Sequence, residues 1–341
     1  MAVLLFAVWL LIQMPPVQTF VAKRVTRSLE DKFGGKIEFS SVHLKPFNAL
    51  ILKDVRLVDD DPPVTPGGEV LDTLAKAQSI TATFSIKGLF KKEGLHLGKV
   101  SVGGASFTYV SEERGSNIKR FFGSSGKEKE KEKKEMGSLF DAEKVQVSDF
   151  RFRLVNLKHP RPSEEGGINW TDLDITVHDL EAKDLNLSNG YMKGEVERLS
   201  ATERSGYHIN SLSGKTTVGG GAAIVENLKM TDDWSDIRMD EYHMRYHDIY
   251  SFNEFLDEVS IGGTIRNSII DFKSLSYFST ALKPMNVRFN VTKASVDGPV
   301  SDLGIDRTEF FETGSGVSGK AEGRITAVSY THLTLPTIYS V

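Results

Sequence analysis

Residues that could bind a dinucleotide stand together near the end of the sequence. Gly314, Gly316 and Gly319 match the GxGxxG pattern, in which glycines let the backbone approach a pyrophosphate. That chemistry needs a buried strand before the pattern and a helix after it, within a βαβ unit. The sequence offers neither, so the pattern predicts a glycine-rich turn between two strands and no cofactor.

Two histidines and an acidic triplet have the residue types of a metal site but not its spacing. His243 and His247 would share one face of a helix, but the alternating Tyr242, Met244 and Tyr246 indicate a strand. On a strand the two histidines lie ~13 Å apart, too far to share one ion. The triplet at 59–61 lacks the EF-hand spacing and predicts a polar turn after a strand. We therefore expect no metal.

The composition removes several further classes of function. The chain has 341 residues, with 42 Lys+Arg, 46 Asp+Glu, a formal net charge of −4 and no Cys. A near-neutral balance argues against a nucleic-acid partner, because such proteins need a clustered basic face. The absence of Cys excludes disulfides, thiolate zinc sites, iron–sulfur clusters and a Cys nucleophile. No nucleophile elbow surrounds a Ser. We expect no catalytic residue, and a protein that is not an enzyme.

The elements that fill the chain are strands. From residue 36 onward, apolar and polar residues alternate with period two, which is typical of strands that bury one face. The only helical candidates in this part are 118–122 and 249–256. The clearest alternating segments are Val100-Ser-Val102, Val145-Gln-Val147, Phe150-Arg-Phe152, Ile175-Thr-Val177 and Met244-Arg-Tyr246.

A loose repeat joins these segments into a larger pattern. An apolar pair is followed by a small insertion and then by a longer alternating run, at 42–57, 100–109, 145–154 and 173–187. The insertions at Lys53-Asp54, Gly103-Gly104, Ser148-Asp149 and His178-Asp179 shift the phase, which predicts bulges or tight turns that bend the sheet. The predicted fold is mainly β: an elongated, curved, repeat-like sheet rich in antiparallel pairs, forming a U-shaped groove.

Two helices are expected before the sheet. Residues 2–12 are unbroken apolar sequence, shorter than the ~20 residues that span a bilayer, so we expect 1–18 to be a transmembrane anchor truncated at its N-terminus. A short buried core helix is the alternative. In 19–35 apolar residues recur every four positions, which predicts an amphipathic helix. It would lie against lipid headgroups or, alternatively, pack on the next domain.

The remaining boundaries follow from composition. A first β-segment is expected over 36–122, a charged loop with the run KEKEKEKKE over 123–138, and further groove over 139–327. The loop has no apolar face, so disorder is expected, with a charged single helix as the alternative. Residues 328–341 resemble the translated read-through of a sequencing adapter, and we expect them to be foreign to the natural protein.

Residues 15–60 carry a resemblance to a known family. In the TamB proteins of Bacteroidetes, within the AsmA-like group, a membrane helix ends in Pro-Pro-Val-Gln and an amphipathic helix follows, then a strand pair with the pattern Leu-x-Leu-x-x-Val-x-Val-x-Asp. This chain has PPVQ at 15–18, and Leu50, Leu52, Val55, Leu57 and Asp59 stand at the pattern positions, with Leu57 replacing a Val. The chain therefore resembles the N-terminal part of a TamB protein.

The resemblance implies an inner-membrane, single-pass anchor that carries a β-groove through the periplasm. Such a protein is expected to move phospholipid toward the outer membrane. The alternative is a scaffold that assists outer-membrane protein assembly with an Omp85-type barrel, which would meet a C-terminal domain absent from this chain.

Alternation alone does not decide whether the apolar face is filled core or an open trough for acyl chains. If it is a trough, the residues expected to line it are Val100, Val102, Val145, Val147, Phe150, Phe152, Ile175, Val177, Met244 and Tyr246.

Overall fold

The computed structural model describes residues 35–45, 49–84, 95–123, 138–188, 190–247, 251, 254–299, 301–328, 332–334 and 338–340. The predicted membrane anchor, the amphipathic helix except for residue 35, and positions 124–137 of the charged loop lie outside them. The described chain is mainly β, with mostly antiparallel, unclosed sheet, as the alternation predicted. It divides into two compact units, the first containing residues up to 160 and the second most residues from 161 onward.

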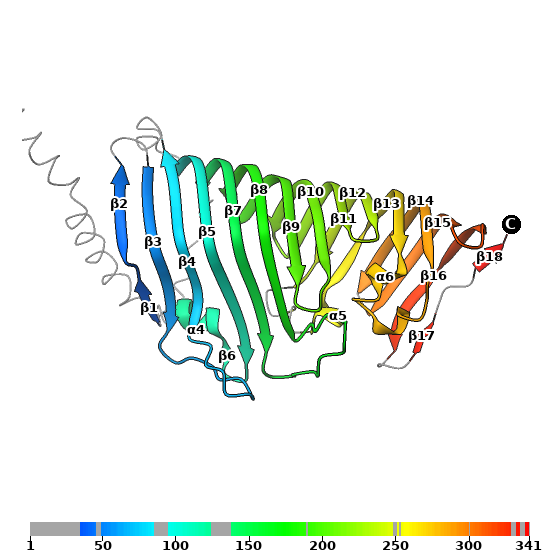
Figure 1. Ribbon diagram of the computed structural model, residues 1–341, viewed down its shortest axis with the longest axis horizontal. Helices are drawn as coiled ribbons and strands as arrows, with labels where there is room; N and C mark the ends of the chain where they lie inside the picture. The colour runs from blue at the N-terminus through cyan, green and yellow to red at the C-terminus, as the bar shows by residue number, and fades with distance from the viewer. Residues whose placement is uncertain are drawn as a thin grey trace, which may run out of the picture. The chain divides into compact units, whose positions relative to one another are not determined.

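The first unit is built on a run of neighbouring strands (Figure 1). Its strands are β1 (Gly35–Glu38), β2 (Ser41–Lys45), β3 (Ala49–Asp59), β4 (Thr73–Phe84), β5 (Leu95–Glu112), β6 (Gly115–Ser116) and β7 (Ser138–Asn156). Both β1 and β2 pair with β3, and β3–β4 and β4–β5 are antiparallel, whereas β5 and β7 are parallel. Strand β8 (Asp172–Ser188) contributes residues to both units.

The helix predicted at 118–122 is confirmed as α4 (Asn117–Gly123), which lies near one end of these strands (Figure 1). Asn117 is buried and bonds to β5, because its Oδ1 accepts from the Val110 N–H at 2.9 Å and its amide donates to the Thr108 carbonyl at 2.7 Å. Phe121 of α4 is also fully buried. The helix thereby covers polar backbone that would otherwise be unpaired.

Three of the four predicted insertions mark a bend of the first unit's strands. Asp54, Gly104 and Asp149 have φ of 51°, 57° and 53°, a left-handed conformation that Asp and Gly tolerate best. The flanking pairs place these residues in one row across β3, β4, β5 and β7, with Gln78 as the β4 member. The fourth prediction is displaced, since β8 has its left-handed residue at Asp184 and not at His178-Asp179.

Of the two alternatives predicted, bulges or tight turns, the pairing of β3 with β4 excludes a bulge at this row. Pairing continues in the same register on both sides of the row, with Lys53 opposite Ser79 before it and Val55 opposite Ala77 after it. One residue turns on each of β3, β5 and β7, and because the register is kept, the side-chain alternation changes phase at the same row on β4 as well. As a result the apolar residues on both sides of the bend stay on one face of the sheet.

The second unit has antiparallel strands linked mostly in sequence order. They are β9 (Tyr191–Glu203), β10 (His208–Gly219), β11 (Ala222–Asp232), β12 (Asp236–Arg245), β13 (Ser260–Asp271), β14 (Arg288–Pro299), β15 (Asp302–Glu312) and β16 (Ser318–Val328). Each pairs with the next along the chain. Two further short strands, β17 (His332–Thr334) and β18 (Ile338–Ser340), pair with β16; they fall in the tail predicted to be foreign.

Short helices interrupt the second unit at two connections. The link from β12 to β13 contains α5 (Phe255–Glu258), which overlaps the helix predicted at 249–256 only at its last two residues and ends two residues beyond it. The link from β13 to β14 contains α6 (Phe272–Leu275) and the 3₁₀ helix η2 (Thr280–Leu282). We call residues 272–287 the insert. Asp271 caps α6, because its side chain accepts from the Lys273 N–H.

The glycine-rich and acidic motifs lie in the turns expected of them, whereas only the first of the two histidines lies on the expected strand. Gly314 and Gly316 lie in the turn between β15 and β16, and Asp59 ends β3 with its side chain accepting from the Asp61 N–H. His243 lies on β12, while His247 lies just past the strand's end. Within the described residues, no group of His, Asp and Glu could hold a metal ion.

Candidate functional site

The second unit contains an apolar cavity of about 1660 Å³. Pockets for drug-sized ligands are roughly 300–1,000 Å³, so this cavity exceeds what a small polar metabolite needs. Its floor is the apolar face of the strands from β10 to β16, and much of its other lining comes from the insert and from residues 161–170, with further residues from α5 and the turn between β15 and β16. The floor includes Leu228, Met230, Met239, Tyr242, Ile261, Ile265, Ile270, Phe289, Val291, Ala294, Val296, Ile305 and Phe310.

Strand register brings the floor residues together. Met239 on β12 is paired with both Leu228 and Ile265, and Ile265 is also opposite Ala294. These residues come from four strands and form one row, because directly paired residues lie on the same face. Ile265 and Phe289 pack against the buried residues Val291, Ala294 and Phe310 but stay partly exposed themselves. The apolar face is therefore not filled by its own side chains.

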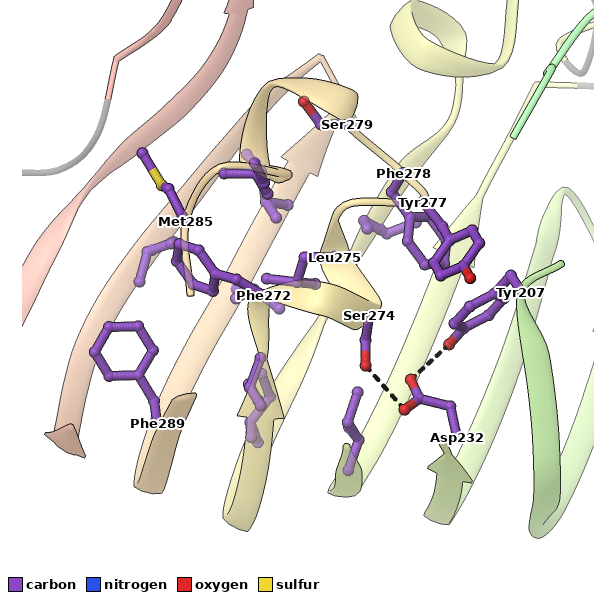
Figure 2. Close-up of a pocket in the computed structure, with 18 of the residues that line it drawn as sticks. Tyr207, Asp232, Phe272, Ser274, Leu275, Tyr277, Phe278, Ser279, Met285 and Phe289 are labelled. Atoms are coloured by element: carbon purple, nitrogen blue, oxygen red, sulfur yellow. Dashed lines mark hydrogen bonds between the residues drawn. The ribbon is translucent and has the colours of Figure 1, made fainter. Parts of the chain in front are cut away.

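The insert lies over this face (Figure 2). It contributes Phe272, Leu275, Tyr277, Phe278 and Met285 to the cavity lining. Its neighbour is the 161–170 segment, since the Ile168 N–H donates to the Tyr277 carbonyl at 2.8 Å. A hydrogen bond from Thr280 to the Glu164 carboxylate and a ring contact of 6.0 Å between Trp170 and Phe278 join the same two segments.

A buried carboxylate attaches the insert to the sheet. Asp232 ends β11 and accepts from Ser274 at 2.8 Å and from the Tyr207 hydroxyl at 3.1 Å (Figure 2). It also accepts from the Trp234 N–H at 2.8 Å and the Ser235 N–H at 2.6 Å. Ser235 in turn contacts Ser274 at 2.7 Å. With four donors on one carboxylate, the charge is stabilised in spite of its burial.

Two tyrosines at the cavity are held neutral. Burial, followed by the charge and hydrogen bond of Asp232, raises the pKa of Tyr207 well above its usual range. Burial also raises the pKa of Tyr242 on the cavity floor. The two phenols therefore add no charge near neutral pH, and they present largely apolar rings to the cavity.

The residues predicted to line a trough in the first unit share one face there. Val100 and Val102 on β5 are opposite Val145 and Val147 on β7. Beyond the bend, the rings of Phe107 and Phe152 are stacked with centroids 6.2 Å apart.

Phe150 belongs to the same face, because Ala105 opposite it continues the apolar row. Val145 is buried, whereas Val100, Val102, Val147, Phe150 and Phe152 are only partly buried.

The remaining four predicted residues are less closely assembled. Ile175 and Val177 are half-buried on β8. Asp174 forms an ion pair with Arg151, so these two side chains lie on the same face. Because side chains alternate along a strand, Ile175 points to the opposite face, the side of Phe150 and Phe152. Met244 is opposite Ala223 and Ile261 on the same face as Tyr242, but neither it nor Tyr246 lines the cavity.

Sequence reasoning missed the insert and the 161–170 segment. A signal for the insert was present in the run FKSLSYFSTALKPM (272–285), in which bulky residues recur at three- and four-residue spacing. It was weak because the helices are only 4 and 3 residues long.

Comparison with known proteins returned no family model, no curated protein and no solved structure that matches this chain. Among the residues that the structure describes, no helix is long and apolar enough to cross a membrane.

Proposed function

We propose that this chain is the membrane-proximal part of an anchored periplasmic protein that moves phospholipid toward the outer membrane along the apolar face of its strands. The anchor would be residues 1–18 and the path a U-shaped β-groove. The observation that carries the proposal is the large cavity with a partly exposed apolar floor. A floor of this kind can take up acyl chains without first removing protein side chains.

The energetic argument concerns the acyl chains. A diacyl phospholipid has on the order of 30 methylenes, each worth ~0.8 kcal/mol on transfer out of water. Moving the lipid bare through water would therefore cost more than ~20 kcal/mol. An apolar row kept on one face across the bend of β3, β4, β5 and β7 would lower that barrier, because the chains would remain in apolar surroundings.

The alternative role is a scaffold that assists outer-membrane protein assembly with an Omp85-type barrel. A scaffold would present exposed strand edges and would have no use for an open apolar interior. The cavity therefore favours the lipid path over the scaffold.

Photo-crosslinking in cells tests the proposal. A photoreactive residue would replace Val147 or Met230 on the apolar face. Separately it would replace Gln146 or Lys229, the preceding residue on each strand, whose side chain points to the opposite face. Phospholipid adducts at the first pair and none at the second are expected. Adducts to a nascent outer-membrane protein, with no lipid at Val147 or Met230, would instead support the scaffold.

A further inference from the structure

The charged residues that line the cavity are mostly acidic. Among the described residues they are Arg161, Glu164, Asp232, Asp257 and Glu312. The lining therefore contains four carboxylates and one guanidinium. This imbalance exceeds that of the whole chain, which has 46 acidic and 42 basic residues. The charged lining of the cavity therefore carries an excess of negative charge.

Three of these carboxylates lie where a lipid headgroup could approach them. Glu164 and Asp257 are exposed, and Glu312 is partly exposed. The structure also keeps Glu312 ionised. The hydroxyl and N–H of Ser315, and then the N–H of Gly314, donate to its carboxylate and lower its pKa below the usual value.

One of these carboxylates is bound to the segment that carries two aromatic residues of the lining. The Thr280–Glu164 hydrogen bond holds Glu164 next to the part of the insert that carries Tyr277 and Phe278. These two rings line the cavity together with Trp170. Aromatic faces attract ammonium groups and do not attract phosphate.

We propose that the cavity of the second unit takes phospholipids whose headgroup carries an ammonium group, and disfavours lipids with net negative charge. This inference rests on the proposed lipid path and names the lipid class for it. In water, one carboxylate about 6 Å from a unit charge changes affinity about threefold. With three accessible carboxylates against Arg161, the net of two charges favours the zwitterionic lipid about tenfold.

The test is a competition for lipid. The full chain, purified in detergent, would be incubated with vesicles of equimolar phosphatidylethanolamine and phosphatidylglycerol, then repurified, and the retained lipids counted by mass spectrometry. Wild type in 10 mM salt is expected to retain about ten phosphatidylethanolamines for each phosphatidylglycerol. In 1 M salt the ratio should approach one, because the screening length falls from about 30 Å to about 3 Å.

Substitutions assign the preference to the cavity. The triple variant Glu164→Gln, Asp257→Asn and Glu312→Gln keeps the side-chain shapes and should bring the low-salt ratio close to one. A matched control changes net charge equally at Glu226, Glu309 and Glu322, each to Gln, none of which lines the cavity; its ratio should remain at about ten. Arg161→Gln should raise the ratio, and an effect in this direction cannot come from unfolding.

The outcomes separate the two proposals. Retention of phosphatidylglycerol equal to or above phosphatidylethanolamine in wild type overturns the headgroup preference and leaves the lipid path standing. A preference that the triple variant and 1 M salt leave unchanged also overturns it. If wild type retains neither lipid, both the headgroup preference and the lipid path are wrong.

Discussion

Replacing Asp232 tests whether its carboxylate holds the insert over the cavity floor. Asp232→Asn keeps an oxygen at the Oδ1 position, where Ser274, Trp234 and Ser235 donate. Its amide nitrogen would face the Tyr207 hydroxyl, which can accept. Charge-assisted bonds are worth ~1.5–3 kcal/mol and neutral ones ~1, but Asn also avoids burying a charge. We expect the free energy of unfolding to fall by only about 1–2 kcal/mol.

Asp232→Ala removes the acceptor altogether. Four donors that are buried or partly buried then lose their partner, at ~1–3 kcal/mol each before water enters the space. We expect a loss of about 4 kcal/mol, at least twice that of Asp232→Asn. Urea unfolding followed by tryptophan fluorescence measures both values, since Trp170 and Trp234 belong to this unit.

The position of the insert gives an independent readout. Hydrogen exchange of residues 272–285 should quicken in Asp232→Ala and in Ser274→Ala, because α6 loses its bond to the sheet (Figure 2). A control is Asp240→Ala, an exposed partner of Arg266, which should cost less than ~1 kcal/mol and leave exchange in the insert unchanged. Two results would refute the reasoning. One is an equal loss of unfolding free energy in Asp232→Asn and Asp232→Ala, and the other is unchanged hydrogen exchange of the insert in Asp232→Ala and Ser274→Ala.

Three further predictions follow from the same structure. Gly104→Ala should lower the free energy of unfolding by about 1–2 kcal/mol, measured in urea, because φ is 57° and the new Cβ would lie 2.4–2.8 Å from the Gln78 side chain. Adding Gln78→Ala should recover only the part of this loss that comes from the contact. Full recovery would show that backbone strain is absent. The lowered pKa of Glu312 means that its stabilising effect is present above about pH 4.5 and disappears as pH falls through the folded pKa; Glu312→Gln should flatten the stability profile only in that acidic range. The raised pKa of Tyr207 means that its contribution to stability is fully present below about pH 10 and is lost at higher pH. Tyr207→Phe should therefore make the free energy of unfolding fall less steeply with pH in the alkaline range. An unchanged slope would argue against a buried phenol beside Asp232.

The strands and most of their bends could be predicted from sequence because both depend on local spacing. Period-two alternation identifies a strand that buries one face, and a one-residue change of phase at Asp54, Gly104 and Asp149 marks where the backbone turns. The error at His178-Asp179 has a local cause as well. Apolar spacing in β8 changes phase there, but the residue in the left-handed conformation is Asp184, and both sites offer an Asp.

The sequence by itself therefore determined the class of fold, the position of α4 and the absence of any cofactor motif in a suitable context. The tertiary structure alone decided that bends in β3, β4, β5 and β7 coincide in one row, and that the cavity lies in the second unit. It also decided that the insert meets residues 161–170, more than a hundred positions away in the chain. Alternation is a property of neighbouring residues, whereas a cavity depends on strand register and on contacts between distant segments, which no local period records.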